Sequence, residues 1–289
     1  MLQSILAALF YVVQNVSNKL FSEHFKNSLY TLTVFNAIAL ALGVGALGLL
    51  FRPRLISAGG MLFSLAFGAL FVLTITMIVV TMSRGPLGPS GLIIDMNIVV
   101  TVLFGALFWK EPLTPVQLAA LMILLVVIVL LALPEEKETA RMRIGWLMTA
   151  LSTMVCNGVL NIVQSSAFMV CEGLNSSDFT FWSLLMGMLV CAALAVGLKL
   201  FAKAGLDRSE PLKKLPLIAA GQGLGTAVAY YFHNEALLLL PSVIVFPVVV
   251  GVENGQLTLS SILFFHEKFT PRKGVALCLG LIGILMINM

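Results

Sequence analysis

The chain has 289 residues, of which 60% are hydrophobic and 10% are charged, and its net charge is +4. A soluble domain has about 25% charged residues, so this composition excludes an ordinary soluble protein and indicates one embedded in a lipid bilayer. The positive residues stand at the ends of apolar stretches, as expected beside membrane spans, and they do not indicate nucleic-acid binding.

Ten apolar stretches predict ten transmembrane helices. A helix needs about 20 apolar residues to cross the hydrocarbon core of a bilayer. In chain order, the predicted spans are 2–22, 29–51, 60–82, 86–108, 115–133, 143–168, 177–200, 215–238, 241–264 and 272–289. The polar connections at 134–143 and 203–214 are too short to form a soluble domain. The chain is therefore predicted to be an all-α membrane protein with one integral membrane domain.

One turn occurs twice in the sequence. Residues 108–115 read Phe-Trp-Lys-Glu-Pro-Leu-Thr-Pro, and residues 264–271 read Phe-Phe-His-Glu-Lys-Phe-Thr-Pro, at an offset of 156 residues. Phe, Glu, Thr and Pro recur in register. Thr is a good N-cap, and Pro is tolerated at the first position of a helix, so each turn is predicted to introduce the last helix of a half. Glu111 and Glu267 are interpreted as residues that stabilise these turns.

The repeated turn divides the chain into two five-helix halves, residues 1–134 and 135–289. Because five is an odd number, the second half must enter the membrane in the opposite orientation to the first. The sequence thus predicts an inverted-topology repeat, an architecture typical of secondary transporters.

These features resemble the drug/metabolite transporter superfamily, of the ten-helix EamA type. The resemblance rests on the two five-helix repeats, on the Glu–x–apolar–Thr–Pro turn before the last helix of each, and on a polar first span that ends in Asn15 to Lys19. The fifth span departs from the family pattern because it lacks the glycines that the tenth span has. The resemblance implies a plasma-membrane carrier of small organic solutes with a central cavity.

Two acidic residues stand near the middle of predicted spans: Asp95 in the fourth and Glu253 in the ninth. An ionisable group at this depth costs a few kcal/mol or more, so it should face a water-filled cavity or a partner. A carboxylate in a low-dielectric site is suited to pick up and release protons near neutral pH. The functional interpretation is a cation or proton site. The alternative is a buried structural pair, for instance with Lys19 or Arg84.

Two asparagines accompany these acids as candidate binding residues. Asn97 aligns with Glu253 at the offset of 156 residues, and Asn254 follows Glu253 directly. Asp95 and Asn97 are two residues apart, so in a continuous helix their side chains point in different directions.

Amide side chains form two stripes at helical spacing in the first and sixth spans. Their members repeat at i, i+4 and i+7, which places each stripe on one helix face. The first stripe is Tyr11, Asn15 and Asn18, and the second, at an offset of 146 residues, is Asn157, Asn161 and Gln164. Amides are costly in lipid, so we expect both stripes to line a common cavity. Hydrogen bonding between helices is the alternative.

The end of the eighth span carries Tyr230, Tyr231 and His233. These residues suit a gate to the cavity. An ordinary cluster at the membrane–water interface, with Tyr at the level of the lipid headgroups, is the alternative.

The sequence holds no zinc-protease motif, no Asp-rich pair, no Ser/His nucleophile arrangement and no phosphate-binding glycine loop. We therefore expect no enzymatic activity, no cofactor and no bound metal. The preferred function is a secondary carrier working by alternating access, with a cationic or amine-bearing solute and protons as a candidate coupling ion. Export of amino acids or other zwitterionic or neutral metabolites is the alternative, and an intramembrane enzyme or scaffold is the rival from another class. The chain is expected in the lipid bilayer as a monomer or homodimer.

Overall fold

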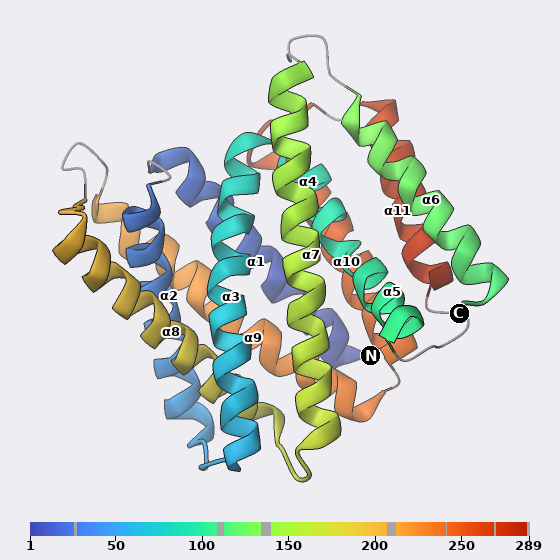
Figure 1. Cartoon of the computed structure of the whole chain (residues 1–289). Helices are drawn as coiled ribbons and strands as arrows, with labels where there is room; N and C mark the ends of the chain where they lie inside the picture. The colour runs from blue at the N-terminus through green and yellow to red at the C-terminus, as the bar shows by residue number, and fades with distance from the viewer. Residues whose placement is uncertain are drawn as a thin grey trace.

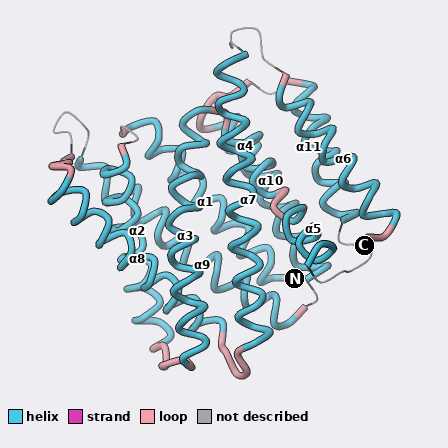
Figure 2. Tube along the Cα trace, viewed as in Figure 1, coloured by secondary structure: helices cyan, strands magenta, loops and turns pink. Residues whose placement is uncertain are grey.

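Helices account for all the regular secondary structure in the described part of the chain, and no β-strand occurs there (Figure 2). In the computed structural model, the described residues are 1–25, 28–108, 113–133, 140–206, 212–240, 242–268 and 270–287. The helices run as long rods across the molecule, and the short loops gather at its two ends (Figure 1).

The helix bounds are close to those predicted from the apolar stretches. The first half contains α1 (Leu2–His24), α2 (Leu29–Phe51), α3 (Ala58–Arg84), α4 (Leu87–Asp95), α5 (Ile98–Phe108) and α6 (Pro115–Ala132). The second half contains α7 (Ala140–Val170), α8 (Ser176–Phe201), the short 3₁₀ helix η1 (Leu212–Lys214), α9 (Leu215–Leu239), α10 (Ser242–Leu263) and α11 (Pro271–Ile287).

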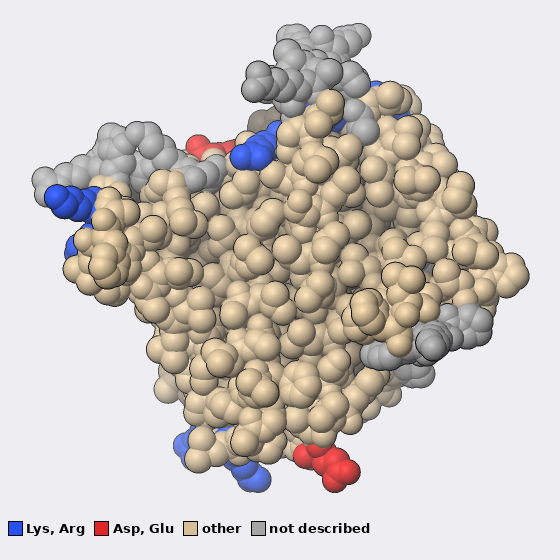
Figure 3. Space-filling model, in the orientation of Figure 1, with Lys and Arg blue, Asp and Glu red and all other residues tan. Residues whose placement is uncertain are grey.

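Several of these helices have the length and hydropathy of membrane spans. Within the described residues, five stretches qualify: Leu29–Phe51, Ala58–Arg84, Leu87–Phe108, Arg143–Val170 and Ser176–Phe201. On the face drawn in Figure 3, the visible charged side chains lie at the upper and lower ends, with an uncharged band between them. This distribution is typical of a membrane protein. The other predicted spans correspond to α1, α6, α9, α10 and α11, so the ten-span arrangement stays a prediction.

The predicted fourth span, 86–108, is not one continuous helix. The helix breaks at Met96 and Asn97, between α4 and α5. The Asn97 N–H donates to the Ile94 carbonyl at 3.1 Å, and the Asn97 side-chain amide donates to the same oxygen at 3.1 Å. These bonds reach back three residues rather than four, which tightens the turn and ends the regular helix.

Threonine begins the last helix of each half, as the repeated turn predicts. The Thr114 hydroxyl accepts from the Gln117 N–H at 3.2 Å, and the Gln117 side chain accepts in return from the Thr114 N–H at 3.0 Å. This reciprocal capping box satisfies two N–H groups that have no partner inside the helix. Thr270 occupies the same place before α11, and its hydroxyl accepts from the Lys273 N–H at 3.4 Å.

Helices from the two halves pack against each other throughout the bundle. Helix α1 packs on α9 and α10, α3 packs on α7 and α8, and α2 packs on both α8 and α9. Helices α6 and α11 pair with each other at one side of the bundle (Figure 1). Helix α4 packs on α7 and α10, so the centre of the molecule is surrounded by α1, α3, α4, α7, α9 and α10.

Candidate solute-binding cavity

A cavity lies at the centre of the bundle, between helices of both halves. Its volume is about 80 Å³, enough for several water molecules, since one water needs about 10–15 Å³ on the same measure. The polar residues that line it are Tyr11, Gln14, Asn15, Asp95, Asn97, Asn157, Asn161, Tyr230, His233 and Glu253.

Each acid in the cavity is held by an amide from the opposite half. The Asn15 amide of α1 donates to Oε1 of Glu253 at 2.9 Å. The Asn254 amide of α10 donates to Oδ2 of Asp95 at 2.7 Å. Hydrogen bonds to a charged acceptor are stronger than neutral ones, so these contacts orient both carboxylates across the boundary between the halves.

A third amide contact is the counterpart of the first. The Asn161 amide of α7 donates to Oδ1 of Asn97 at 2.8 Å. At the sequence offset of 146 residues, Asn161 corresponds to Asn15, and at the offset of 156 residues, Asn97 corresponds to Glu253. The first helix of each half thus contacts the fourth span of the other half through the same pair of positions, with a carboxylate in one contact and an amide in the other.

Asp95 and Asn97 both line the cavity, although a continuous helix would point them in different directions. Two residues apart in an α-helix means about 200° of rotation around its axis. The two side chains also have partners on different helices, because Asp95 accepts from Asn254 of α10 and Asn97 accepts from Asn161 of α7. The expectation that the two side chains point in different directions agrees with these separate partners, and both side chains still reach the cavity.

An aromatic wall closes one side of the cavity. The Tyr11 hydroxyl lies 3.1 Å from Nδ1 of His233, and the rings of Tyr11 and Tyr230 meet edge to face with centroids 5.4 Å apart. Tyr230 is buried, so it does not occupy an exposed interfacial position. Tyr231 does not line the cavity, and its ring packs against Phe51 at a centroid distance of 4.3 Å.

Three other predicted site residues lie outside the cavity lining. Asn18 is fully buried between helices. Gln164 is also buried, and its amide donates to the side chain of Asn234. Asn254 reaches the cavity only through Asp95. Conversely, Gln14 lines the cavity one position away from the predicted stripe, where helical periodicity does not single it out.

Among the described residues that line the cavity, none is a lysine or an arginine. Lys19, a partner of the two acids in the alternative interpretation, lies 3.8 Å from Glu267 in the loop after α10. The described residues also contain no group of three or more His, Cys, Asp or Glu that could hold a metal ion. The lining therefore offers carboxylates, neutral amides and aromatic rings to a bound solute.

Comparison with known proteins gives a family and a fold. The family model of the EamA-like transporter family matches residues 144–289, and this family belongs to the drug/metabolite transporter superfamily. A solved crystal structure, whose description states no function, aligns over 99% of this chain and 94% of its own, with a TM-score of 0.63 and 17% sequence identity. At this identity, the likeness shows a shared fold. A search of curated proteins finds no match.

Proposed function

We propose, because the chain belongs to the EamA-like transporter family, that it is a secondary carrier of a small organic cation. Members of this family are membrane transporters of small solutes. The observation that carries the choice of solute is the cavity lining, in which Asp95 and Glu253 have no lysine or arginine beside them in the part of the chain that the structure describes.

The charge of the cavity favours a positively charged solute. Two carboxylates in one poorly solvated site repel each other, and a cation or a proton relieves this repulsion. The aromatic rings of Tyr11 and Tyr230 belong to the lining, and such rings attract cations that approach their faces. A solute amine and protons therefore compete for the same two carboxylates, which is the chemistry that solute–proton exchange requires.

The volume of the cavity favours a small solute. Pockets for drug-sized ligands have volumes of about 300–1,000 Å³, whereas this cavity has about 80 Å³. A short aliphatic or aromatic amine with few heavy atoms fits this volume with the least movement of the surrounding helices.

The packing of the helices supports an inverted repeat and hence alternating access. In an inverted repeat, α1, α2 and α3 correspond to α7, α8 and α9. The contact of α1 with α9 then has its counterpart in the contact of α7 with α3. Likewise, the contact of α2 with α9 has its counterpart in the contact of α8 with α3. Two close helix approaches follow the same exchange. A Cβ on Gly43 would lie 2.6 Å from the Gly223 carbonyl oxygen, and a Cβ on Gly68 would lie 2.6 Å from the Gly187 nitrogen.

A thermal-shift experiment tests the proposed solute class. We expect small monoamines to raise the unfolding temperature of the purified protein, by an amount equivalent to about 2.7 kcal/mol at a concentration 100 times the Kd. The shift should be larger at about pH 8 than at about pH 6, because protons compete for the two carboxylates at the lower pH. Monocarboxylic acids of matched size serve as controls. Stabilisation by these acids, with none by the amines, would rule out a cation site.

A further inference from the structure

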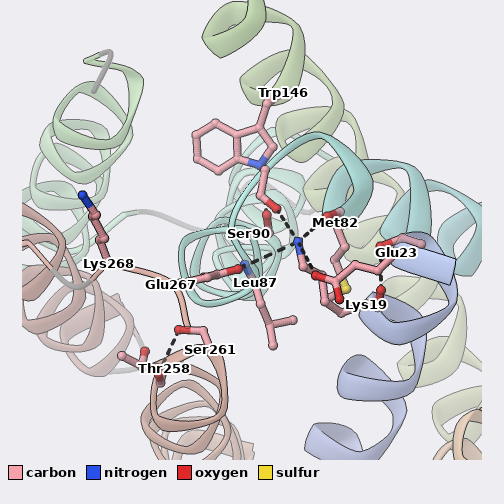
Figure 4. Close-up of polar contacts among 12 residues, drawn as sticks. Lys19, Glu23, Met82, Leu87, Ser90, Trp146, Thr258, Ser261, Glu267 and Lys268 are labelled. Atoms are coloured by element: carbon pink, nitrogen blue, oxygen red, sulfur yellow. Dashed lines mark hydrogen bonds and ion pairs between the residues drawn. The ribbon is translucent and has the colours of Figure 1, made fainter. Parts of the chain in front are cut away.

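A charged cluster outside the cavity joins three separate parts of the chain (Figure 4). Nζ of Lys19, near the end of α1, donates to the carbonyl oxygens of Met82 at 3.0 Å and Gly85 at 3.2 Å, where α3 ends. The same Nζ lies 3.8 Å from Oε1 of Glu267, which belongs to the loop between α10 and α11. Both charged side chains are mostly buried, with exposures of 12% for Lys19 and 14% for Glu267.

Glu267 also holds the start of α4. Its Oε1 accepts from the Leu87 N–H at 2.7 Å, and a carboxylate at a helix N-terminus is favourable because the first N–H groups have no partner inside the helix. Burial raises the pKa of Glu267, whereas the Leu87 hydrogen bond and the charges of Lys19 and Lys273 lower it. The turn between α3 and α4 is thus held both by Lys19 and by Glu267, a residue of the other half.

This cluster lies at one end of the bundle, above the cavity. Helices α1 and α3 end there and α4 begins there, at the upper side of Figure 1. Along α4, Leu87 precedes Asp95 by eight residues, which is about 12 Å at 1.5 Å per residue. We call this end of the molecule the latch face and the contact between Lys19 and Glu267 the latch.

The opposite end has no equivalent lysine on α7. At the offset of 146 residues, the position that corresponds to Lys19 is Ser165, which carries no charge. The counterpart of Glu267 is Glu111, which lies outside the described residues. The lysine of the latch therefore occurs at only one end of the molecule. The close helix contacts around the centre, in contrast, have a counterpart in each half.

We propose that the latch is the gate that keeps the cavity closed on the latch face, and that opening this face requires the contact between Lys19 and Glu267 to break. This proposal rests on alternating access but goes beyond the cation site, because none of the latch residues touches the cavity. Separating the two charges moves α1 and the α3–α4 turn of the first half away from the α10–α11 loop of the second half.

Thiol labelling of reconstituted protein tests the latch. Ile78, which lines the cavity on α3, is replaced by Cys in a background without the native cysteines Cys156, Cys171, Cys191 and Cys278. A membrane-impermeant thiol reagent is added to one side of the vesicles at a time. Sidedness is read from a tag at Met1, because α1 starts at the face opposite the latch.

We expect Glu267→Gln and Lys19→Met each to accelerate labelling from the latch face about tenfold. Gln at position 267 can still accept from the Leu87 N–H, so this variant removes the charge and keeps the helix cap. Glu23→Gln is the matched control. Glu23 lies 4.0 Å from Lys19 within α1, so it links no separate parts of the chain and its loss should leave the labelling rate unchanged.

Latch-face labelling at the parental rate in Glu267→Gln would overturn the proposal, and so would an equal acceleration in Glu23→Gln. Glu267→Gln decides the question even if Lys19→Met fails to fold. The readout needs no solute, so it is separate from the cation site. A failure of the amine-binding test would leave the labelling result standing, and the reverse also holds.

Discussion

Replacing Glu253 by Gln or Asp95 by Asn is expected to weaken amine binding and transport about 10–100-fold. A hydrogen bond to a charged group contributes about 1.5–3 kcal/mol, and each 1.4 kcal/mol corresponds to a factor of about ten in affinity. Both substitutions keep the size of the side chain, and the Asn15 and Asn254 amides still find an oxygen acceptor there. The loss should therefore appear in solute affinity and in its pH dependence rather than in folding.

Glu235→Gln is the control for the cavity acids. Glu235 lies on α9, two residues after His233, but it does not line the cavity. Its substitution should leave both affinity and pH dependence unchanged. If Glu253→Gln and Asp95→Asn transport like the parent between about pH 5 and pH 8, the two acids have only a structural role.

Alanine at Gly223 is expected to destabilise the protein by about 3 kcal/mol or more, because overpacking at a close contact forces the backbone to move. A Cβ at this position would lie 1.8 Å from the carbonyl oxygen of Ala39 on α2. A flexible side chain could move aside, but this oxygen belongs to the backbone of a neighbouring helix. Helices α2 and α9 also come close at Gly43 of α2, where an added Cβ would lie against the backbone of Gly223.

Gly45→Ala on the same helix α2 is the matched control. A Cβ on Gly45 would meet nothing within 4 Å, and alanine is about 1 kcal/mol better than glycine inside a helix. This variant should unfold at or above the parental temperature. Thermal unfolding in detergent measures both variants, and equal unfolding temperatures for Gly223→Ala and Gly45→Ala would contradict the packing described here.

Hydropathy predicted where the helices lie but not where one of them breaks. The span predicted at 29–51 is helix α2, Leu29–Phe51, because a continuous apolar run has few alternatives to a membrane helix. The break at Met96 and Asn97 involves no glycine or proline. It depends on an Asn97 side chain that bonds to its own backbone, and asparagine makes such a bond in only some of the places where it occurs.

Helical periodicity predicted which face of a helix lines the cavity, but not how far along the helix the cavity extends. Asn15 and Asn161 lie on the predicted stripes and in the cavity lining, whereas Asn18 and Gln164, one turn further along the same faces, do not line it. A stripe can extend beyond the cavity that it borders, and only the packing of the other helices sets where the cavity ends.

Long-range contacts were the least predictable part of the molecule. Glu267 was interpreted as a residue that stabilises its own turn, yet its carboxylate accepts from Leu87, 180 residues away in the sequence. Nothing in the local sequence around Glu267 identifies a partner in the other half. Lys19 was named as a partner of Asp95 or Glu253 only in the alternative interpretation, and its partner across the halves is Glu267.

Counterflow in proteoliposomes tests the central claim, that this chain is a carrier with a cation site at Asp95 and Glu253, most directly. Vesicles loaded with an unlabelled amine that stabilises the protein are diluted into the same amine in labelled form. A carrier that alternates between two faces should accumulate the label transiently above its outside concentration, and Glu253→Gln should strongly reduce this accumulation. Simple equilibration without accumulation, or accumulation that persists in both Glu253→Gln and Asp95→Asn, would contradict the account.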